Sequence, residues 1–143
     1  MNSAFDHNRV ILCHFDTYSA ASFFARYGAS VLAPSPLPEG AVAVAAPADI
    51  AEEHEPDRVL QALIERYGFP PEALVIASGF QEWVESAGKP IRIHLLKFTT
   101  FDAPREAIEP LGGVFKPISE MRGMPTIELN LLRRAFNLVM SGG

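Results

Sequence analysis

The segment Pro125–Met140 constrains the fold more than any other part of this sequence, because it has the pattern of a long helix that is apolar on most of its sides. Pro125 suits the first turn of a helix, and Glu128 near the start complements the helix dipole. A helix on a protein surface needs an apolar stripe of only about 100°. Here the apolar positions cover well over half of the circumference: Ile127, Leu129, Leu131, Leu132, Ala135, Phe136, Leu138, Val139 and Met140. We therefore expect this helix to run through the middle of the fold or to be buried on a second side by another subunit.

The composition fits a single folded domain. The chain has 143 residues, of which 48% are hydrophobic and 20% are charged. This is enough apolar material for the core of one domain of ordinary size. Residues 1–8 are polar and lack periodicity, so we expect a flexible N-terminus followed by one domain over residues 9–143.

Local patterns predict both strands and helices. A strand is expected at 9–15 and a short one at 41–46, with helices at 18–27, 57–67 and 103–111. Two β-favouring runs, 73–84 and 90–100, are joined by residues 85–89 and predict a long β-hairpin. Together these elements predict an α+β fold in which one mixed sheet with a long hairpin is covered by three or four helices.

The hairpin register can be predicted from its side chains. Pairing Glu82 with Arg92 places opposite charges across the two strands and sets Phe80 against His94. Such cross-strand pairs each favour a register by about 0.2–1 kcal/mol.

Charge and cysteine content narrow the class of protein. Twelve Lys and Arg against seventeen Asp and Glu give a formal net charge of −5, which argues against a nucleic-acid partner. The single cysteine, Cys13, excludes an internal disulfide and a cysteine-rich zinc site. No apolar stretch approaches the roughly 20 residues that cross a bilayer, and the first residues lack a signal-peptide pattern. We therefore expect a cytoplasmic protein without a membrane or nucleic-acid partner.

His14 and Asp16 are the strongest candidates for catalytic residues. They lie two positions apart at the end of a predicted strand, so on one face they could act as a base and its orienting carboxylate. Cys13 points to the other face, which weakens a Cys–His nucleophile pair. The alternative to a catalytic site is that each residue only stabilises the fold. Cys13 would then lie in the core, His14 would be partly buried with a hydrogen bond, and Asp16 would cap the helix at 18–27.

Arg92, His94 and Trp83 form a second candidate, a ligand-binding site on the hairpin. Arg92 and His94 share a face and could bind an anion or a carboxylate, while Trp83 could line a pocket. The alternative is a solvated sheet face with a Glu82–Arg92 ion pair. We expect no metal and no cofactor, because the four histidines are scattered and the phosphate-binding glycine motifs are absent.

The stretch Arg105–Gly113 resembles the second half of the Nudix box over about nine residues. In that family a helix presents glutamates to a divalent metal that holds a diphosphate, and Glu106 and Glu109 would lie on one side of such a helix. This sequence departs from the family pattern at Pro110, where the family has a glutamate. It departs again upstream, where Ile91 and Lys97 occupy the glycine and glutamate positions, so we do not transfer the Nudix site.

These observations give three hypotheses for function. The first is a non-catalytic homo-oligomeric module that binds a small ligand or a protein partner. The second is a small hydrolase or isomerase that uses His14 and Asp16, and the third is a degenerate Nudix-like phosphohydrolase. We favour the first because no catalytic set is complete. We expect a homodimer through the last helix, with contacts among Leu129, Leu132, Phe136, Val139 and Met140.

Overall fold

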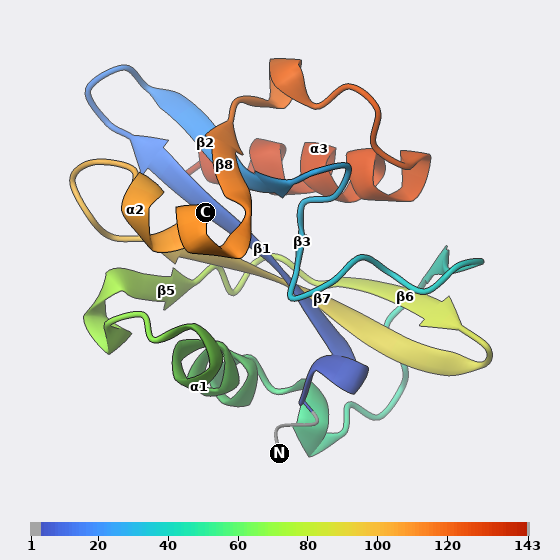
Figure 1. The fold of residues 1–143 in the computed structure, drawn as a ribbon. Coiled ribbons are helices and arrows are strands. Elements are labelled where there is room, and N and C mark those ends of the chain that lie inside the picture. Colours follow the sequence, from blue (N-terminus) through green and yellow to red (C-terminus); the bar gives the residue numbers. More distant parts are fainter. Residues whose placement is uncertain (1–3, 143) are drawn as a thin grey trace.

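A mixed eight-stranded sheet forms the centre of the protein (Figure 1). The computed structural model describes residues 4–142. The strand order is β4-β6-β7-β1-β2-β8, with β3 also paired to β1 and β5 also paired to β7. The strands are β1 Asn8–Asp16, β2 Ala21–Tyr27, β3 Leu32–Ala33, β4 Val42–Val44, β5 Leu74–Ile76, β6 Glu82–Ser86, β7 Lys89–Phe98 and β8 Gly113–Lys116. Strands β1 and β7 run parallel, and the other pairs are antiparallel.

Helices cover both faces of this sheet (Figure 1). The α-helices within residues 4–142 are α1 Pro56–Tyr67, α2 Arg105–Ile108 and α3 Thr126–Met140. Short 3-10 helices are η1 Ala4–Asp6, η2 Glu52–His54, η3 Pro71–Ala73, η4 Glu109–Leu111 and η5 Ile118–Glu120. The predicted α+β class, the helix at 57–67 and the final helix are confirmed, whereas the helix expected at 103–111 is α2 continued by η4. No helix of the described residues is long and apolar enough to span a membrane.

The middle of the central strand β1, residues 10–13, is apolar because both of its faces are buried there. Val10 and Leu12 pack into the core on the α1 side, whereas Ile11 and Cys13 pack into the core on the α3 side. All four side chains are fully buried. A strand buried on both faces needs an unbroken apolar run, which is the pattern that made this strand predictable.

The prediction of a helix at 18–27 is wrong, because Ala21–Tyr27 form strand β2. Phe24 is buried on the α3 side of the sheet, and its neighbours Phe23 and Ala25 pack on the α1 side. The spacing of these apolar residues fits helical and extended periodicity equally well. β2 pairs with β1 on one side and with β8 on the other, which provides hydrogen-bond partners for its backbone N–H and C=O groups. This tertiary context overrides the local preference for a helix.

The long hairpin is confirmed, but its tip and register differ from the sequence prediction. The loop has two residues, Ala87 and Gly88, with φ values of 53° and 77°. Positive φ at both central residues is the requirement of a type I′ turn, which fixes the register of the strands that it joins. Glu82 therefore lies opposite Ile93, one residue away from the predicted pairing with Arg92.

The first arm of the hairpin is interrupted between β5 and β6. Gly79 lies in this break, where a Cβ atom would come within 3.2 Å of Cδ1 of Leu138 on α3. The close approach of α3 is a physical reason for the interruption. The two short strands pair with β7 in different registers, since Ile76 lies opposite Leu96. The register expected across the whole arm is thus wrong.

Helix α3 buries most of its apolar surface against other parts of its own chain. Leu131, Leu132 and Ala135 are buried in the core on this face of the sheet. The segment 117–124 contributes Met121 and Met124 to the same core. The broad apolar circumference of the helix therefore has partners in the sheet and in this preceding segment.

Part of the expected flexible N-terminus lies in regular secondary structure. Residues 4–6 form η1, in which Phe5 is buried, and Asn8 begins β1 with no exposed surface. Residues 1–3 of that expected terminus lie outside the described residues.

Gly113 gives a direct test of the packing between β8 and its neighbours. A Cβ atom there would lie 2.9 Å from Cε1 of Tyr27 and 3.2 Å from Cβ of Ile108. We predict that Gly113→Ala destabilises the protein by about 1–3 kcal/mol through overpacking. Gly79→Ala should cost less, because the flexible end of Leu138 can move away. Urea unfolding curves measure both, and equal losses would contradict the packing around Gly113.

Candidate functional site

The interior of the α1 side holds a polar cluster, which we call the histidine cluster: Asn8, His54, Trp83, Arg92 and His94. Asn8 lies at its centre and has no exposed surface. Its Nδ2 donates to the carbonyls of Ala4 at 2.8 Å and Glu53 at 2.7 Å. Nε2 of His94 donates to Oδ1 of Asn8 at 2.8 Å, and Nδ1 of His54 lies 3.4 Å from the same oxygen. The cluster thus ties η1 and η2 to the central strands.

Aromatic and cationic groups complete the histidine cluster. Trp83 lies opposite Arg92 across the β6–β7 pair, and the guanidinium carbon lies 5.5 Å from the centroid of the indole ring. The ring of His54 meets the indole edge-on, with centroids 4.8 Å apart. Arg92 also donates through Nη1 to the backbone carbonyl of His54 at 3.2 Å. The structure therefore brings together the three residues Trp83, Arg92 and His94 that we singled out from the sequence.

Burial keeps the imidazoles of the histidine cluster neutral. Desolvation, followed by the electrostatic influence of Arg92 and His54, lowers the pKa of His94 to about 3. Desolvation is also the main cause that lowers the pKa of His54. His54, Trp83 and His94 are each at most 3% exposed. The histidine cluster therefore lies mostly inside the protein, with Arg92 as its partly exposed member.

The acid stability of the protein tests the neutral state of His94. The pKa of His94 is depressed in the folded protein, so between its ordinary value of 6.5 and about 3 the unfolded chain binds more protons. Stability should therefore fall as pH falls through this range, with a slope from His94 of up to about 1.4 kcal/mol per pH unit. We predict that His94→Gln loses this slope when unfolding free energy is measured against pH. His7→Gln is the control and should keep it, and an unchanged slope in His94→Gln would contradict a buried neutral His94.

His14 and Asp16 lie at the other end of β1, in different surroundings. His14 is 1% exposed, and its Nε2 donates to the carbonyl of Thr100 at 2.8 Å. Asp16 is at the surface, where it accepts hydrogen bonds from the backbone N–H of Tyr18 and the hydroxyl of Ser19, both at 2.9 Å. The hydrogen bond from Ser19 is the main cause that lowers the pKa of Asp16. Asp16 therefore stabilises a turn between two strands and does not cap a helix.

The two candidate sites do not meet. His94 is level with Val10 on the neighbouring strand, and His14 lies four residues further along β1. At ~3.3 Å per residue, the two histidines are about 13 Å apart along the sheet. The apolar side chains of Leu12 and Leu96 fill the space between them on this face.

The Nudix-like stretch forms α2 and η4, a single α-helical turn and a 3-10 turn. Glu106, Glu109 and Pro110 border a surface hollow of about 300 Å³. Within residues 4–142, no group of three or more His, Cys, Asp or Glu side chains is arranged to hold a metal ion.

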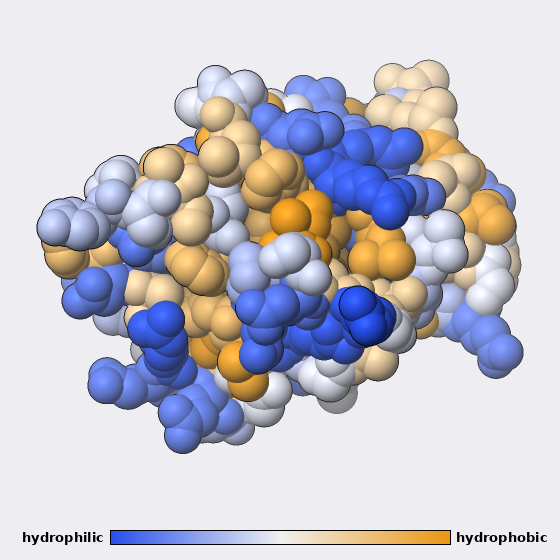
Figure 2. All heavy atoms as spheres, turned by 90° about the horizontal axis from the view of Figure 1, so that it is seen from above, coloured by the Kyte–Doolittle hydropathy of each residue, from blue (hydrophilic) through white to orange (hydrophobic). Residues whose placement is uncertain are grey.

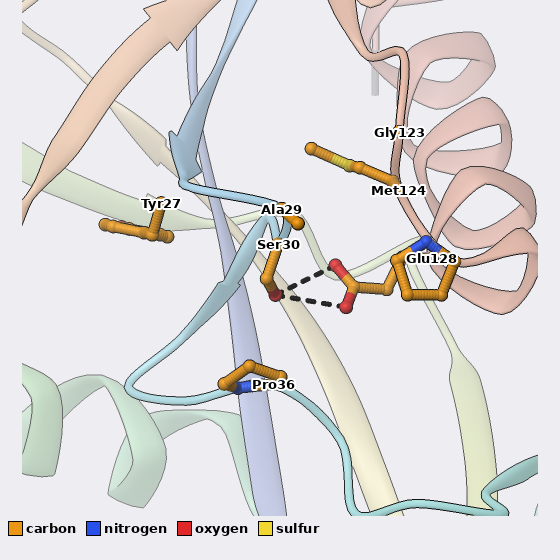
Figure 3. Close-up of a pocket in the computed structure, with 8 residues that line it drawn as sticks. Tyr27, Ala29, Ser30, Pro36, Gly123, Met124 and Glu128 are labelled. Atoms are coloured by element: carbon orange, nitrogen blue, oxygen red, sulfur yellow. Dashed lines mark hydrogen bonds between the residues drawn. The ribbon is translucent and has the colours of Figure 1, made fainter.

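A larger hollow lies where the turn between β2 and β3 meets the start of α3 (Figure 3). We call it the Ser30–Glu128 pocket, and its volume is about 490 Å³. Its polar lining residues are Tyr27, Ser30 and Glu128. The remaining lining residues are Ala29, Pro36, Gly123, Met124 and Pro125. A mainly apolar hollow with a few polar groups is the common form of a small-molecule site.

Glu128 is the chemically unusual residue of this pocket, because it is an acidic residue that is only 2% exposed. Its Oε1 accepts the backbone N–H of Val31 at 2.8 Å and the hydroxyl of Ser30 at 2.9 Å. Its Oε2 lies 3.0 Å from the same hydroxyl, whose oxygen also accepts the N–H of Leu32. Within residues 4–142, no cationic side chain forms an ion pair with Glu128. Burial raises the pKa of Glu128, and the hydrogen bonds from Val31 and Ser30 oppose this shift.

Sequence reasoning did not identify Ser30 or Glu128 as site residues. We assigned Glu128 only a favourable place near the start of the helix dipole. A signal was nevertheless present, because Leu131, Leu132 and Ala135 follow Glu128 at intervals of three, four and seven residues. A carboxylate at this position lies on the buried stripe of the helix, where an acidic residue requires an explanation.

Substitutions of Glu128 separate its hydrogen bonds from its charge. Glu128→Ala should lose about 1–3 kcal/mol, because it leaves the N–H of Val31 and the hydroxyl of Ser30 without their acceptor. Glu128→Gln keeps an acceptor oxygen and removes the charge. Since the folded pKa of Glu128 is raised, its burial costs stability as pH rises through that pKa, so Glu128→Gln should match or exceed the wild-type stability at neutral pH. Chemical denaturation checks this, and equal losses in both variants would show that the charge itself stabilises the fold.

Comparison of the sequence with protein-family models and with curated proteins gave no match. The geometry of the two polar sites is therefore the basis for a functional proposal.

Proposed function

We propose that this protein is a non-catalytic module that binds a small ligand in the Ser30–Glu128 pocket. The observation that carries the proposal is the buried carboxylate of Glu128, which lines a hollow of about 490 Å³ without a cationic partner in the described chain. Buried titratable groups that lack a structural counter-charge concentrate at functional sites. The mainly apolar walls around it supply contact area for the body of a ligand.

The surroundings of the reactive side chains favour binding over catalysis. Burial raises the pKa of the Cys13 thiol to about 12, so the thiol is a poor nucleophile. His14 is buried and hydrogen-bonded to a backbone carbonyl, while Asp16 stabilises a surface turn. We therefore prefer a binding module to a hydrolase or isomerase that would use His14 and Asp16. The single helical turn that carries Glu106 and the 3-10 turn at Glu109 likewise give little support to a Nudix-like phosphohydrolase.

We also propose that the module is a homodimer that associates through α3. Leu132 and Val139 are buried in the core of their own chain, so the contact would use Leu129, Phe136 and Met140. Met140 is 44% exposed, and the other two are partly exposed. Figure 2 views the molecule from the α3 side and has apolar atoms at the surface between groups of hydrophilic atoms. A two-fold contact is the common symmetry for such a surface.

The remaining parts of the proposal concern location and partners. The buried free thiol of Cys13 suits the reducing environment of the cytoplasm, where we place the protein. The net charge of −5 supports a small molecule over a nucleic acid as the ligand. The proposal includes no cofactor or metal.

A fragment screen tests ligand binding at the pocket. We predict that some fragments shift the amide NMR signals of Ala29 and Val31 and raise the melting temperature, because a ligand at 100 times its Kd stabilises the folded state by roughly 2.7 kcal/mol. Ala29 lines the pocket and is exposed, so Ala29→Trp should fill it and abolish these effects. Ala45→Trp, at an exposed position outside the pocket, is the matched control. A screen in which no fragment shifts these signals would count against the proposed function.

Light scattering tests the dimer. We predict a mass near twice the 15.6 kDa of one chain at micromolar concentration, and a fall toward one chain when Leu129 and Met140 are both replaced by Lys. Tyr18→Lys, which changes a surface residue on the turn between β1 and β2, is the control and should leave the mass unchanged. A wild-type mass near 15.6 kDa would refute the dimer.

A further inference from the structure

The Ser30–Glu128 pocket has a polar group that the protein itself does not fully satisfy. A carboxylate has about four acceptor sites on its two oxygens. The N–H of Val31 and the hydroxyl of Ser30 both reach Oε1 of Glu128, and Oε2 shares only that hydroxyl. The hydroxyl has one proton to give, so the two oxygens together receive two donors for about four acceptor sites. Oε2 does not receive the N–H of Val31, so it has the larger share of the unfilled acceptor sites that a ligand can use.

The nearby cation Arg26 does not supply a counter-charge to Glu128. Arg26 is close to the pocket, because its Nη2 lies 3.7 Å from the position that a Cβ atom on Gly123 would occupy. Its guanidinium, however, donates to the backbone carbonyls of Gly28, Glu120 and Arg122. Arg26 therefore fixes the loops beside the pocket and forms no ion pair with Glu128.

The rest of the pocket determines the shape of a matching ligand. In Figure 3 the carboxylate of Glu128 points toward Ser30, with Met124 on one side and Pro36 on the other. Met124 is a flexible apolar side chain that adapts to different ligand shapes. A ligand that fills this space needs a compact apolar body and one polar head directed at Glu128.

We propose that the Ser30–Glu128 pocket binds a small organic cation, a primary ammonium group on a compact apolar body. The ammonium donates to Oε2 of Glu128, and the body packs between Met124 and Pro36. This inference rests on the proposed function and adds the chemical class of the ligand. A buried carboxylate requires a counter-charge or a proton, and a ligand cation supplies the counter-charge that the described chain lacks. A metal ion is a poor match, because the pocket offers a single carboxylate.

Three probes of similar shape test the charge of the head group: benzylammonium, benzyl alcohol and benzoate. Each is titrated into the wild-type protein, Glu128→Gln and Ala29→Trp, and binding is followed through the amide NMR signals of the pocket. We expect benzylammonium to bind the wild type at least tenfold more tightly than benzyl alcohol, with benzoate the weakest. Glu128→Gln should remove the tenfold preference, and Ala29→Trp should weaken the binding of every probe.

The outcomes separate this inference from the proposed function. If benzyl alcohol or benzoate binds in the pocket as tightly as benzylammonium, the pocket is a ligand site but the cation class is wrong. If Glu128→Gln keeps the preference for benzylammonium, Glu128 does not recognise the ammonium and the inference is also wrong. Binding that Ala29→Trp leaves unchanged would remove both the inference and its site. The comparison of probes on the wild-type protein decides the question even if Glu128→Gln does not fold.

Discussion

The parallel pairing of β1 with β7 is the constraint on which the rest of the structure depends. Six residue pairs join these strands, from Asn8 opposite Arg92 to Cys13 opposite Lys97. A parallel pair at the centre of a sheet needs apolar cover on both faces, which α1 and α3 supply from opposite sides. The same pairing aligns Asn8 with the hairpin residues of the histidine cluster. The polar interior on the α1 side thus follows from the strand arrangement.

Glu128 links the stability of the fold to the proposed function. Its carboxylate connects the first turn of α3 to the turn that follows β2 through the N–H of Val31 and the hydroxyl of Ser30. An uncharged residue could make similar hydrogen bonds without the cost of burying a charge. A carboxylate at this position therefore sacrifices stability, and functional sites are where such costs are common. The histidine cluster differs, because its imidazoles are neutral and engaged with Asn8.

The sequence predicted those parts of the structure that local signals determine. Gly68 ends α1 in the left-handed conformation, which is a common helix-end signal. The hairpin follows from two β-favouring runs, and its pairing explains why Arg92 and Trp83 could be assigned to one candidate site. Strand β2 was missed because its aromatic spacing fits a helix as well, and only pairing with β1 and β8 decides between the two. The Ser30–Glu128 pocket joins residues 98 positions apart. Contacts of this kind depend on the whole topology and leave only an indirect signal, an acidic residue on the buried stripe of a helix.

The titration of Glu128 tests the central claim most directly, that a buried carboxylate without a counter-charge lines the pocket. Its side-chain carboxyl carbon can be followed by ¹³C NMR against pH and assigned by its absence in Glu128→Gln. We predict a midpoint above the ordinary glutamate value of 4.5, because burial is the largest influence on this group. A cation bound at Oε2 should lower that midpoint. A midpoint at or below 4.5 in the ligand-free protein would show that the carboxylate is solvated or already paired, and would contradict the proposed site.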